Sequence, residues 1–365
     1  MGYPGHGVCK GVIWGNVAGD DTSGRFWGEL PLRVIVRFWR KGLRMRVVFC
    51  GSGEFALPSL HACCQSGHEI LAVITQPARR AGRGGTLRPT PVALAGGELD
   101  LPVIECADIN AADMVARLKE MRADAMIVVD FGQMIRLDAR QSARLDVFNL
   151  HASLLPELRG AAPVNWAIMR GYRTTGVTTF SLVDKMDAGD IYLQLSTDID
   201  PHETAQELKT RLAKLGSHAV VKTLEMLGAD PPTVPVPQNH SKATRARALQ
   251  KSDGIIDWSL SACDICRQIH GTWPWPGAKA TLLHKDRRID VTLARCDVPE
   301  GVCDGSEGEL GENLSVCTGS GRLMILELKP AGKRLMKWKD FVNGYRITPG
   351  DAFVTLSNVK NAEGC

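Results

Sequence analysis

Strand-like and helix-like segments alternate between Met45 and His151, and this alternation constrains the fold more than any other feature of the chain. The expected strands are Met45–Cys50, Ile70–Thr75, Pro102–Ile104, Ala125–Asp130 and Val147–His151, with helices near Phe55–Ser66, from Pro91 and near Asn110–Met121. Connections of this length suit right-handed crossovers between parallel strands. The sequence therefore predicts an α/β domain with a Rossmann-like, mostly parallel sheet.

The pattern changes after residue 229. Asp230–Pro237 contains four prolines, which exclude a helix interior and a central strand, so we expect residues 230–251 to be a linker. Short strands separated by turns follow at Ala278–Leu283, Ile289–Arg295, Leu314–Thr318 and Leu323–Lys329. This spacing favours a small OB-like β-barrel. The predicted organisation is an α/β domain at 45–229, a C-terminal barrel domain at 252–357 and a tail at 358–365.

Residues 1–44 form an atypical N-terminal extension. They hold seven of the 44 basic residues and three of the 40 acidic residues, which leaves 45–365 formally neutral. They lack the continuous apolar core of a secretory signal, and no apolar run in the chain approaches the ~18 residues that a membrane span needs. Two hypotheses stay open: Met45 is the native start and 1–44 is a translation artefact, or 1–44 is a disordered or partner-binding arm.

The cysteines indicate the redox environment. Their number, eleven, is odd, and the chain has no export signal, which favours free thiols in a reducing cytoplasm. Cys263 and Cys266 form a CxxC pair near His270, but a zinc site needs further ligands at matching spacing. We interpret Ser259–Ile269 as an amphipathic helix whose buried face holds Leu260, Cys263, Cys266 and Ile269. No metal site is expected.

Two segments are rich in positive charge. Gln76–Pro91 holds four arginines and no acidic residue, and Arg322–Arg346 holds seven bases against two acids, whereas Asp297–Glu312 holds six acids and no base. A basic loop can clamp a phosphate backbone, and segregated charge suits one nucleic-acid-binding face. A solvated loop and ordinary surface scatter are the alternatives.

The turn after the first strand contains Gly51-x-Gly53, which is weak evidence for a dinucleotide site. Ala56 stands at the third glycine position, and Thr75-Gln76-Pro77 ends the second strand where an acidic residue would hold a ribose. We interpret the glycines as a tight strand-to-helix turn beside some other ligand.

A polar cluster is expected where the last parallel strand ends. Asn149–Pro156 supplies an amide, an imidazole and a hydroxyl, and the acidic turn Asp184–Asp190 can bring a carboxylate to that imidazole. Asn149 can donate to a developing oxyanion, and His151 can donate as well or transfer a proton. Asp187 would orient the ring and favour its charged form. Taken singly, the histidine also suits a structural role and the aspartate a turn cap.

These segments resemble a known family. Asn149–Pro156 with Asp187–Asp190 is similar to the signature of the 10-formyltetrahydrofolate-dependent formyltransferases. The resemblance covers essentially all of 45–365 and favours the branch that acts on methionyl-tRNA. That branch is indicated by Gly51–Phe55, Gln76-Pro77 with Ala81–Gly84, Ile256–Ser259, Trp273–Pro276 and Leu328–Lys333. Two departures concern contacts with tRNA: Glu157 replaces an expected basic residue, and Ala78-Arg79-Arg80 differs from the usual form.

The resemblance implies an activity and a set of site residues. The formyl group of 10-formyltetrahydrofolate would pass to the α-amine of initiator methionyl-tRNA, for translation initiation, with no metal. The catalytic residues would be Asn149, His151 and Asp187. Folate would contact Ser153, Leu154, Leu155, Pro156, Asp130, Phe131 and Gly132. The tRNA would contact Arg83, Arg80, Lys333 and Arg334. We expect a monomeric cytoplasmic enzyme with no membrane partner.

Two other functions remain open on the sequence alone. One is formyl transfer to a small amine, such as a glycinamide ribonucleotide or an amino sugar, or to water. Relatives of that kind resemble only residues 45–240, so the second domain argues against them. The other is a noncatalytic nucleic-acid-binding protein with a degenerate Rossmann-like half. Intact Asn149, His151 and Asp187 argue against that alternative.

Overall fold

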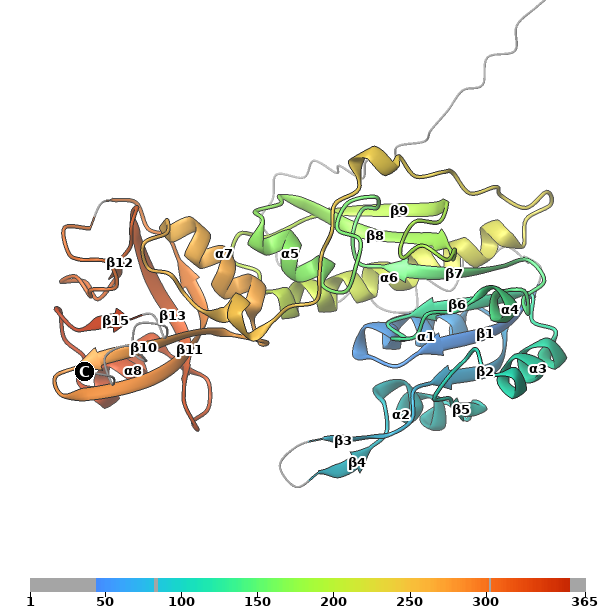
Figure 1. Cartoon of the computed structure of the whole chain (residues 1–365), viewed down its shortest axis with the longest axis horizontal. Helices are drawn as coiled ribbons and strands as arrows, with labels where there is room; N and C mark the ends of the chain where they lie inside the picture. Colours follow the sequence, from blue (N-terminus) through green and yellow to red (C-terminus); the bar gives the residue numbers. More distant parts are fainter. Residues whose placement is uncertain (1–43, 82–84, 302, 355–365) are drawn as a thin grey trace, which may run out of the picture. The chain divides into compact units, whose positions relative to one another are not determined.

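The computed structural model describes residues 44–81, 85–301 and 303–354. Seven strands form the first sheet: β1 (Arg46–Gly51), β2 (Glu69–Thr75), β5 (Val103–Glu105), β6 (Ala125–Val129), β7 (Asp146–His151), β8 (Thr174–Ser181) and β9 (Ile191–Asp198). Their order is β5-β2-β1-β6-β7-β8-β9 (Figure 1). The first five are parallel, and β8 and β9 are antiparallel to their neighbours. The mostly parallel α/β sheet expected from the sequence is confirmed.

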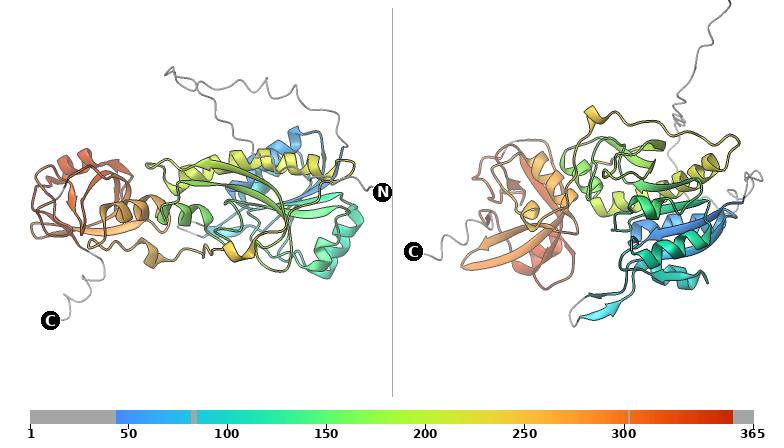
Figure 2. Two further views of the ribbon diagram at one scale, coloured as in Figure 1. Left: turned by 90° about the horizontal axis from the view of Figure 1, so that it is seen from above. Right: turned by 45° about the vertical axis from the view of Figure 1, so that its right-hand side comes forward.

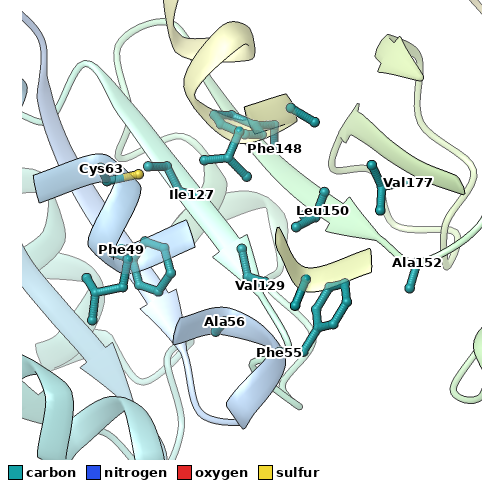
Figure 3. Close-up of a cluster of buried hydrophobic side chains, with 14 of the residues drawn as sticks. Phe49, Phe55, Ala56, Cys63, Ile127, Val129, Phe148, Leu150, Ala152 and Val177 are labelled. Carbon is teal, nitrogen blue, oxygen red and sulfur yellow. The ribbon is translucent and has the colours of Figure 1, made fainter. Parts of the chain in front are cut away.

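Helices cover both faces of this sheet (Figure 2). They are α1 (Leu57–Gln65), preceded by the 3-10 turn η2 (Glu54–Ala56), α2 (Pro91–Glu98), α3 (Ala112–Met121), α4 (Leu137–Arg140), α5 (Pro163–Met169) and α6 (Ala205–Leu227). Side chains alternate between the faces along each strand. Phe49 and Phe148 therefore join the core under α1 and α6 (Figure 3), whereas Val48 and Val147 join the core under α3 and α4.

The long helix α6 shows how local signals start an element. Thr204 is its N-cap, and the Thr204 side chain and that of Glu207 form a reciprocal capping box. The stripe that contains Leu208, Leu212 and Leu224 is buried. The cap fixes the start of the helix at Ala205.

The C-terminal part is a barrel-like antiparallel sheet. Its strands are β10 (Ala278–His284), β11 (Arg287–Asp297), β12 (Val316–Cys317), β13 (Arg322–Pro330), β14 (Met336–Lys337) and β15 (Ala352–Val354), with helices α7 (Ala262–Thr272) and α8 (Trp338–Tyr345). The order is β12-β13-β11-β10-β15. Gly308 N–H donates to Cys317 and Leu310 N–H to Asp351, each at 2.8 Å. The segment Gly308–Leu310 therefore bridges the two edges of the sheet, at β12 and beside β15. This confirms the nearly closed barrel.

Two sequence interpretations need correction. The basic segment that we interpreted as a loop contains an antiparallel hairpin of β3 (Arg79–Ala81) and β4 (Thr86–Arg88). On α7, Leu260 precedes the helix and Cys263 is exposed, so the buried face consists of Ala262, Ile265 and Ile269. Ser261 is the N-cap, and the helix begins at Ala262, later than the periodicity predicted.

The expectation that all cysteines are free is wrong for one pair, since Cys303 and Cys317 form a disulfide. Cys317 lies on strand β12, and Cys303 lies in the acidic segment Asp297–Glu312 that precedes this strand. The calls on the extension, apart from Arg44, on the tail and on Arg83 lie outside the described residues. Among the helices that the structure describes, none has the length and apolarity to cross a membrane.

Candidate functional site

The carboxyl ends of β1, β6 and β7 meet at one edge of the sheet. The chain moves from β1 toward β5 and then returns to the other side of β1, which makes this edge a topological switch point. In the turn after β1, the N–H groups of Ser52 and Gly53 donate to the Asp130 carbonyl at 3.1 and 3.2 Å. A Cβ at Gly53 would stand 2.0 Å from Asp130 Oδ2. The glycine turn therefore fastens β1 to the loop after β6.

A cavity of about 490 Å³ opens at this switch point. Residues 130–132 line one part of it, Asn149 and His151 another, and Asp187 a third. Large apolar side chains are exposed at the lining, namely Met134, Val183 and Met186. The cavity thus combines a polar cluster with an apolar wall that can cover a flat ring system.

Asn149 presents a free amide to the cavity. Its strand neighbours Phe148 and Leu150 belong to the hydrophobic core on the opposite face of the sheet. The Asn149 side chain has no hydrogen-bond partner in the described part of the chain. It is half-buried, so its N–H groups are positioned donors that a bound substrate can use.

His151 is held in one tautomer by its surroundings. Its side chain is buried, and Nε2 lies 2.9 Å from the Leu158 carbonyl oxygen. A carbonyl can only accept, so Nε2 carries a hydrogen. The other nitrogen, Nδ1, lies 3.9 Å from Asp187 Oδ2. In the neutral ring Nδ1 therefore has a free lone pair, and in the charged ring it faces a carboxylate.

Asp187 is fixed by its backbone and by one amide. Its φ is +52°, a left-handed conformation that bends the turn toward the cavity. Oδ2 accepts a hydrogen bond of 2.7 Å from Gly160 N–H. Gly160 itself has a φ of +120°, and a Cβ there would stand 2.5 Å from the Ala246 carbonyl oxygen. Only glycine fits that close approach.

The linker supports this arrangement from behind. Gln238 is buried, and its Nε2 donates to the carbonyls of Asp187 at 3.0 Å and Gly189 at 2.7 Å. Arg159 donates to Gln238 Oε1 at 2.5 Å. Burial lowers the pKa of Arg159, and the nearby Asp187 carboxylate opposes that shift. Gln238, which holds the backbone of the acidic turn, thus lies about fifty residues further along the chain.

The loop after β6 forms the second wall. The Phe131 carbonyl accepts from Ser52 Oγ at 3.2 Å and from Gln76 Nε2 at 2.8 Å. Asp130 has a φ of +48°, and its exposed carboxylate lies 3.6 Å from Lys209 Nζ on α6. These bonds fix the loop, and Asp130, Phe131 and Gly132 line the cavity.

Ser153–Pro156 lies outside the lining of the cavity. Ser153 is buried, and its Oγ donates to the Glu157 carbonyl at 2.7 Å. Thr178 Oγ1 donates to the Ser153 carbonyl and accepts from Leu155 N–H. The contacts described here are therefore those of a turn anchored on β8. The predicted contact of this segment with folate stays a prediction.

Known proteins share both parts of this chain. Residues 44–224 match the formyl transferase family, and residues 248–346 match the formyl transferase C-terminal domain. The chain is 40% identical over 311 residues to a methionyl-tRNA formyltransferase of Solibacter usitatus (strain Ellin6076), covering 84% of this chain and 98% of that protein. It is also 40% identical over 325 residues to a methionyl-tRNA formyltransferase of Koribacter versatilis (strain Ellin345). The chain belongs to the formyl transferase family.

Solved structures show the same fold at low sequence identity. An N-formyltransferase from Helicobacter canadensis, in complex with folinic acid and dTDP-3-aminofucose, has a TM-score of 0.57 and 14% identity, covering 78% of this chain and 98% of that one. HypX from Aquifex aeolicus, in complex with tetrahydrofolic acid, has a TM-score of 0.55 and 16% identity, covering 83% of this chain and 48% of that one. In both comparisons the matched part of this chain extends beyond its α/β domain.

Of the basic residues expected to contact tRNA, the described ones, Arg80, Lys333 and Arg334, do not line the cavity. Arg80 is exposed on the hairpin strand β3, and Arg83 follows it outside the described residues. Lys333 and Arg334 are exposed in the turn between β13 and β14. Among these positions, the described ones are available to solvent. Their contact with tRNA stays a prediction.

Sequence patterns did not reveal Gln238, Gly160 or Lys209. Gln238 follows a proline-rich segment, which we interpreted only as a linker. Lys209 lies on the polar side of a helix, where a lysine has no distinguishing signal. Gly160 lies a few residues after the polar cluster Asn149–Pro156, and this proximity was the only sequence feature that pointed to a role for it in the site.

Proposed function

We propose that this protein transfers the formyl group of 10-formyltetrahydrofolate to the α-amine of initiator methionyl-tRNA. The observation that carries the proposal is the convergence of a free amide, a tautomer-fixed imidazole and a carboxylate in one cavity. Near-full-length relatives named methionyl-tRNA formyltransferase support the choice of acceptor. The charged tRNA acceptor favours a cytoplasmic site of action, and a monomer stays our expectation.

Asn149 supplies the oxyanion contact in this proposal. Attack on a formyl carbon moves negative charge onto the formyl oxygen, and the Asn149 amide donates to that oxygen. A single preorganised donor of this type contributes ~10²–10³ in rate. The lack of a partner in the described residues supports this role, because the donor needs no rearrangement before it meets the substrate.

His151 and Asp187 handle the proton. The lone pair of His151 Nδ1 takes the proton that the attacking amine loses, which contributes roughly 10²–10⁴ in rate. The imidazolium then faces Asp187 Oδ2 at 3.9 Å, and the carboxylate stabilises the positive charge. His151 can return this proton to the nitrogen that leaves. The protein needs no covalent nucleophile, because a neutral amine is itself the nucleophile.

The cavity fits the formyl donor. The apolar lining covers a flat pterin ring, and Asp130, Phe131 and Gly132 line the cavity beside it. The donor supplies an activated formyl group when it is bound. Contact of folate with Ser153, Leu154, Leu155 and Pro156 remains part of the proposal.

The acceptor needs a separate basic surface. We assign Arg80 and Arg83 to the tRNA end that enters the site, and Lys333 and Arg334 to a second contact. Exposure of the described members supports this. The corresponding domains are a catalytic domain at 45–229, a linker at 230–251 and a tRNA-binding domain at 252–357, followed by a tail at 358–365. The family matches to 44–224 and 248–346 support the two domains.

One assay tests the proposed function. The purified protein is mixed with 10-formyltetrahydrofolate and one of three acceptors: methionyl-tRNA, a small amino sugar nucleotide, or water alone. We expect formyl transfer to the aminoacyl end of the tRNA and only background consumption of donor with the other two. Equal consumption of the donor with all three acceptors would identify a hydrolase. No consumption of the donor with any acceptor would favour a noncatalytic nucleic-acid-binding protein.

A further inference from the structure

A second cluster of reactive side chains lies in the C-terminal barrel, and formyl transfer does not use it. Cys266 on α7 and Cys296 on β11 bring their Sγ atoms to 3.0 Å. His270 follows Cys266 by one helical turn, and its ring lies 3.9 Å from Cys266 Sγ and 3.7 Å from Cys296 Sγ. Cys296 and His270 are buried, whereas Cys266 is half-buried. Cys266 is thus the partly exposed member of the cluster.

The hydrogen bonds of His270 determine what the cluster can do. Its Nε2 accepts a bond of 3.2 Å from the buried N–H of Cys296. In the neutral ring the hydrogen therefore sits on Nδ1, which faces Cys266 Sγ. A metal at either nitrogen would displace this amide bond or require an imidazolate. His270 is consequently arranged as a donor to sulfur rather than as a metal ligand.

The sulfur separation supports the same conclusion. Two thiolates on one tetrahedral zinc stand about 3.7 Å apart, given Zn–S bonds of about 2.3 Å. The observed 3.0 Å lies between that spacing and the bond of about 2.05 Å in a disulfide. Closing the pair into a disulfide needs a small side-chain movement, whereas a zinc ion would push the sulfurs apart.

The two thiols differ in their chemistry. The hydrogen bond from Cys296 Sγ lowers the pKa of Cys266, with a further contribution from His270, and together they outweigh burial. Burial raises the pKa of Cys296, and the Cys266 sulfur adds to that shift. Asp297 opposes the lowering at Cys266, and Arg295 opposes the rise at Cys296. Cys266 is the nucleophilic cysteine, and Cys296 is the resolving cysteine beside it.

We propose that Cys266 and Cys296 form a redox-active dithiol that peroxides convert into a disulfide. The Cys266 thiolate attacks one peroxide oxygen, the O–O bond breaks, and the leaving oxygen takes a proton to become water or an alcohol. The resulting sulfenic acid is attacked by the Cys296 sulfur, the S–O bond breaks, and water leaves with the Cys296 proton. The two sulfurs lose two electrons, and the peroxide gains them.

The pair is separate from the disulfide of Cys303 and Cys317. Oxidation would tie α7 to the central strand β11, across 30 residues of chain. Such a cross-link restricts the unfolded chain. We therefore expect the oxidised protein to unfold at a higher temperature than the reduced protein.

Peptide mapping tests the proposal on the full chain. The protein is reduced, freed of reductant, treated with equimolar hydrogen peroxide and alkylated. We expect a peptide pair joined through Cys266 and Cys296, with both thiols lost together. Cross-linking of Cys266 to any other cysteine, or equal alkylation of both thiols with and without peroxide, would overturn the proposal. One equivalent of zinc in the purified protein that disappears in Cys296→Ser would overturn it as well.

Matched variants separate the roles. Cys263→Ser, exposed on the same helix, should oxidise like the parent. Cys296→Ser should stop at a sulfenic acid on Cys266, which a dimedone probe captures. His270→Gln should slow the reaction roughly tenfold by removing a donor to the thiolate. Failure of dimedone to label Cys266 in folded Cys296→Ser would contradict the assigned nucleophile.

Discussion

Replacing Gln238 by leucine tests whether the linker positions the carboxylate of Asp187, which we propose to be catalytic. Leucine fills similar space but leaves the carbonyls of Asp187 and Gly189 without the Gln238 donors. Each buried group left unpaired costs about 1–3 kcal/mol. Gly160 still holds the Asp187 carboxylate, so the turn is only partly displaced. We expect the displacement to raise the activation free energy of formyl transfer by about 2 kcal/mol. That energy corresponds to a roughly 30-fold lower kcat for formyl transfer.

The assay is the initial rate of transfer to methionyl-tRNA over a range of donor concentrations. A positioning effect lowers kcat and leaves the KM for the donor nearly unchanged, because the cavity lining does not include Gln238. Gln238→Glu is the matched variant, since it keeps the contact with Arg159 but loses the amide donor. It should fall at least as far as the leucine variant, because a carboxylate oxygen then faces the two carbonyl oxygens.

A double-mutant cycle completes the test. In an Asp187→Asn background, Gln238→Leu should cost much less than 30-fold, because the carboxylate that it positions is already gone. An unchanged kcat in the single variant would refute the reasoning. So would a full additional loss of activity in the Asp187→Asn background.

The remaining predictions concern stability. Gly189→Ala places a Cβ 1.7 Å from a backbone carbonyl oxygen of β8, so we expect a loss of about 1–3 kcal/mol in denaturant unfolding. Gly97→Ala, with nothing within 4 Å of the added Cβ, should lose none. For Glu207, burial raises the pKa, but hydrogen bonds from Thr204 and Arg295 outweigh it and the net pKa is lowered. Its carboxylate therefore stabilises the fold above the ordinary pKa, and this contribution disappears as the pH falls through the lowered value. Glu207→Gln should cost about 0.5–1 kcal/mol at pH 7 and nothing at the acid end of the range, when unfolding is measured against pH.

Much of the α/β domain could be predicted because its strands are buried on both faces. The middle of β1 and all of β6 are apolar runs, and such runs separated by helical patterns leave few alternatives. Strand β8 carried no comparable signal, because it is rich in threonine. Its buried Thr178 and Thr179 are satisfied by distant partners, Ser153 and Thr223. A pattern within the strand cannot reveal those bonds.

The candidate site likewise contains residues that the sequence identified and residues that it could not identify. Asn149, His151 and Asp187 were identified by residue type, spacing and resemblance, and the structure brings them to one cavity. Gln238 could not be identified, because its role depends on the path by which the linker returns. The CxxC pattern drew attention to Cys263, yet Cys266 pairs with Cys296. Helix phase and strand placement decide that pairing.

The central claim is that Asn149, His151 and Asp187 together carry formyl transfer. Its most direct test is the single-turnover transfer rate of Asn149→Asp, His151→Gln and Asp187→Asn. Asp187→Asn keeps an oxygen for the Gly160 N–H and removes only the charge. The control is Asp184→Asn, whose carboxylate is exposed on the same turn.

We expect each of the three variants to lose at least ~10²-fold in rate while it binds the formyl donor as the parent does. The control should keep the parent rate. A transfer rate close to that of the parent in any of the three folded variants would contradict the account of this site.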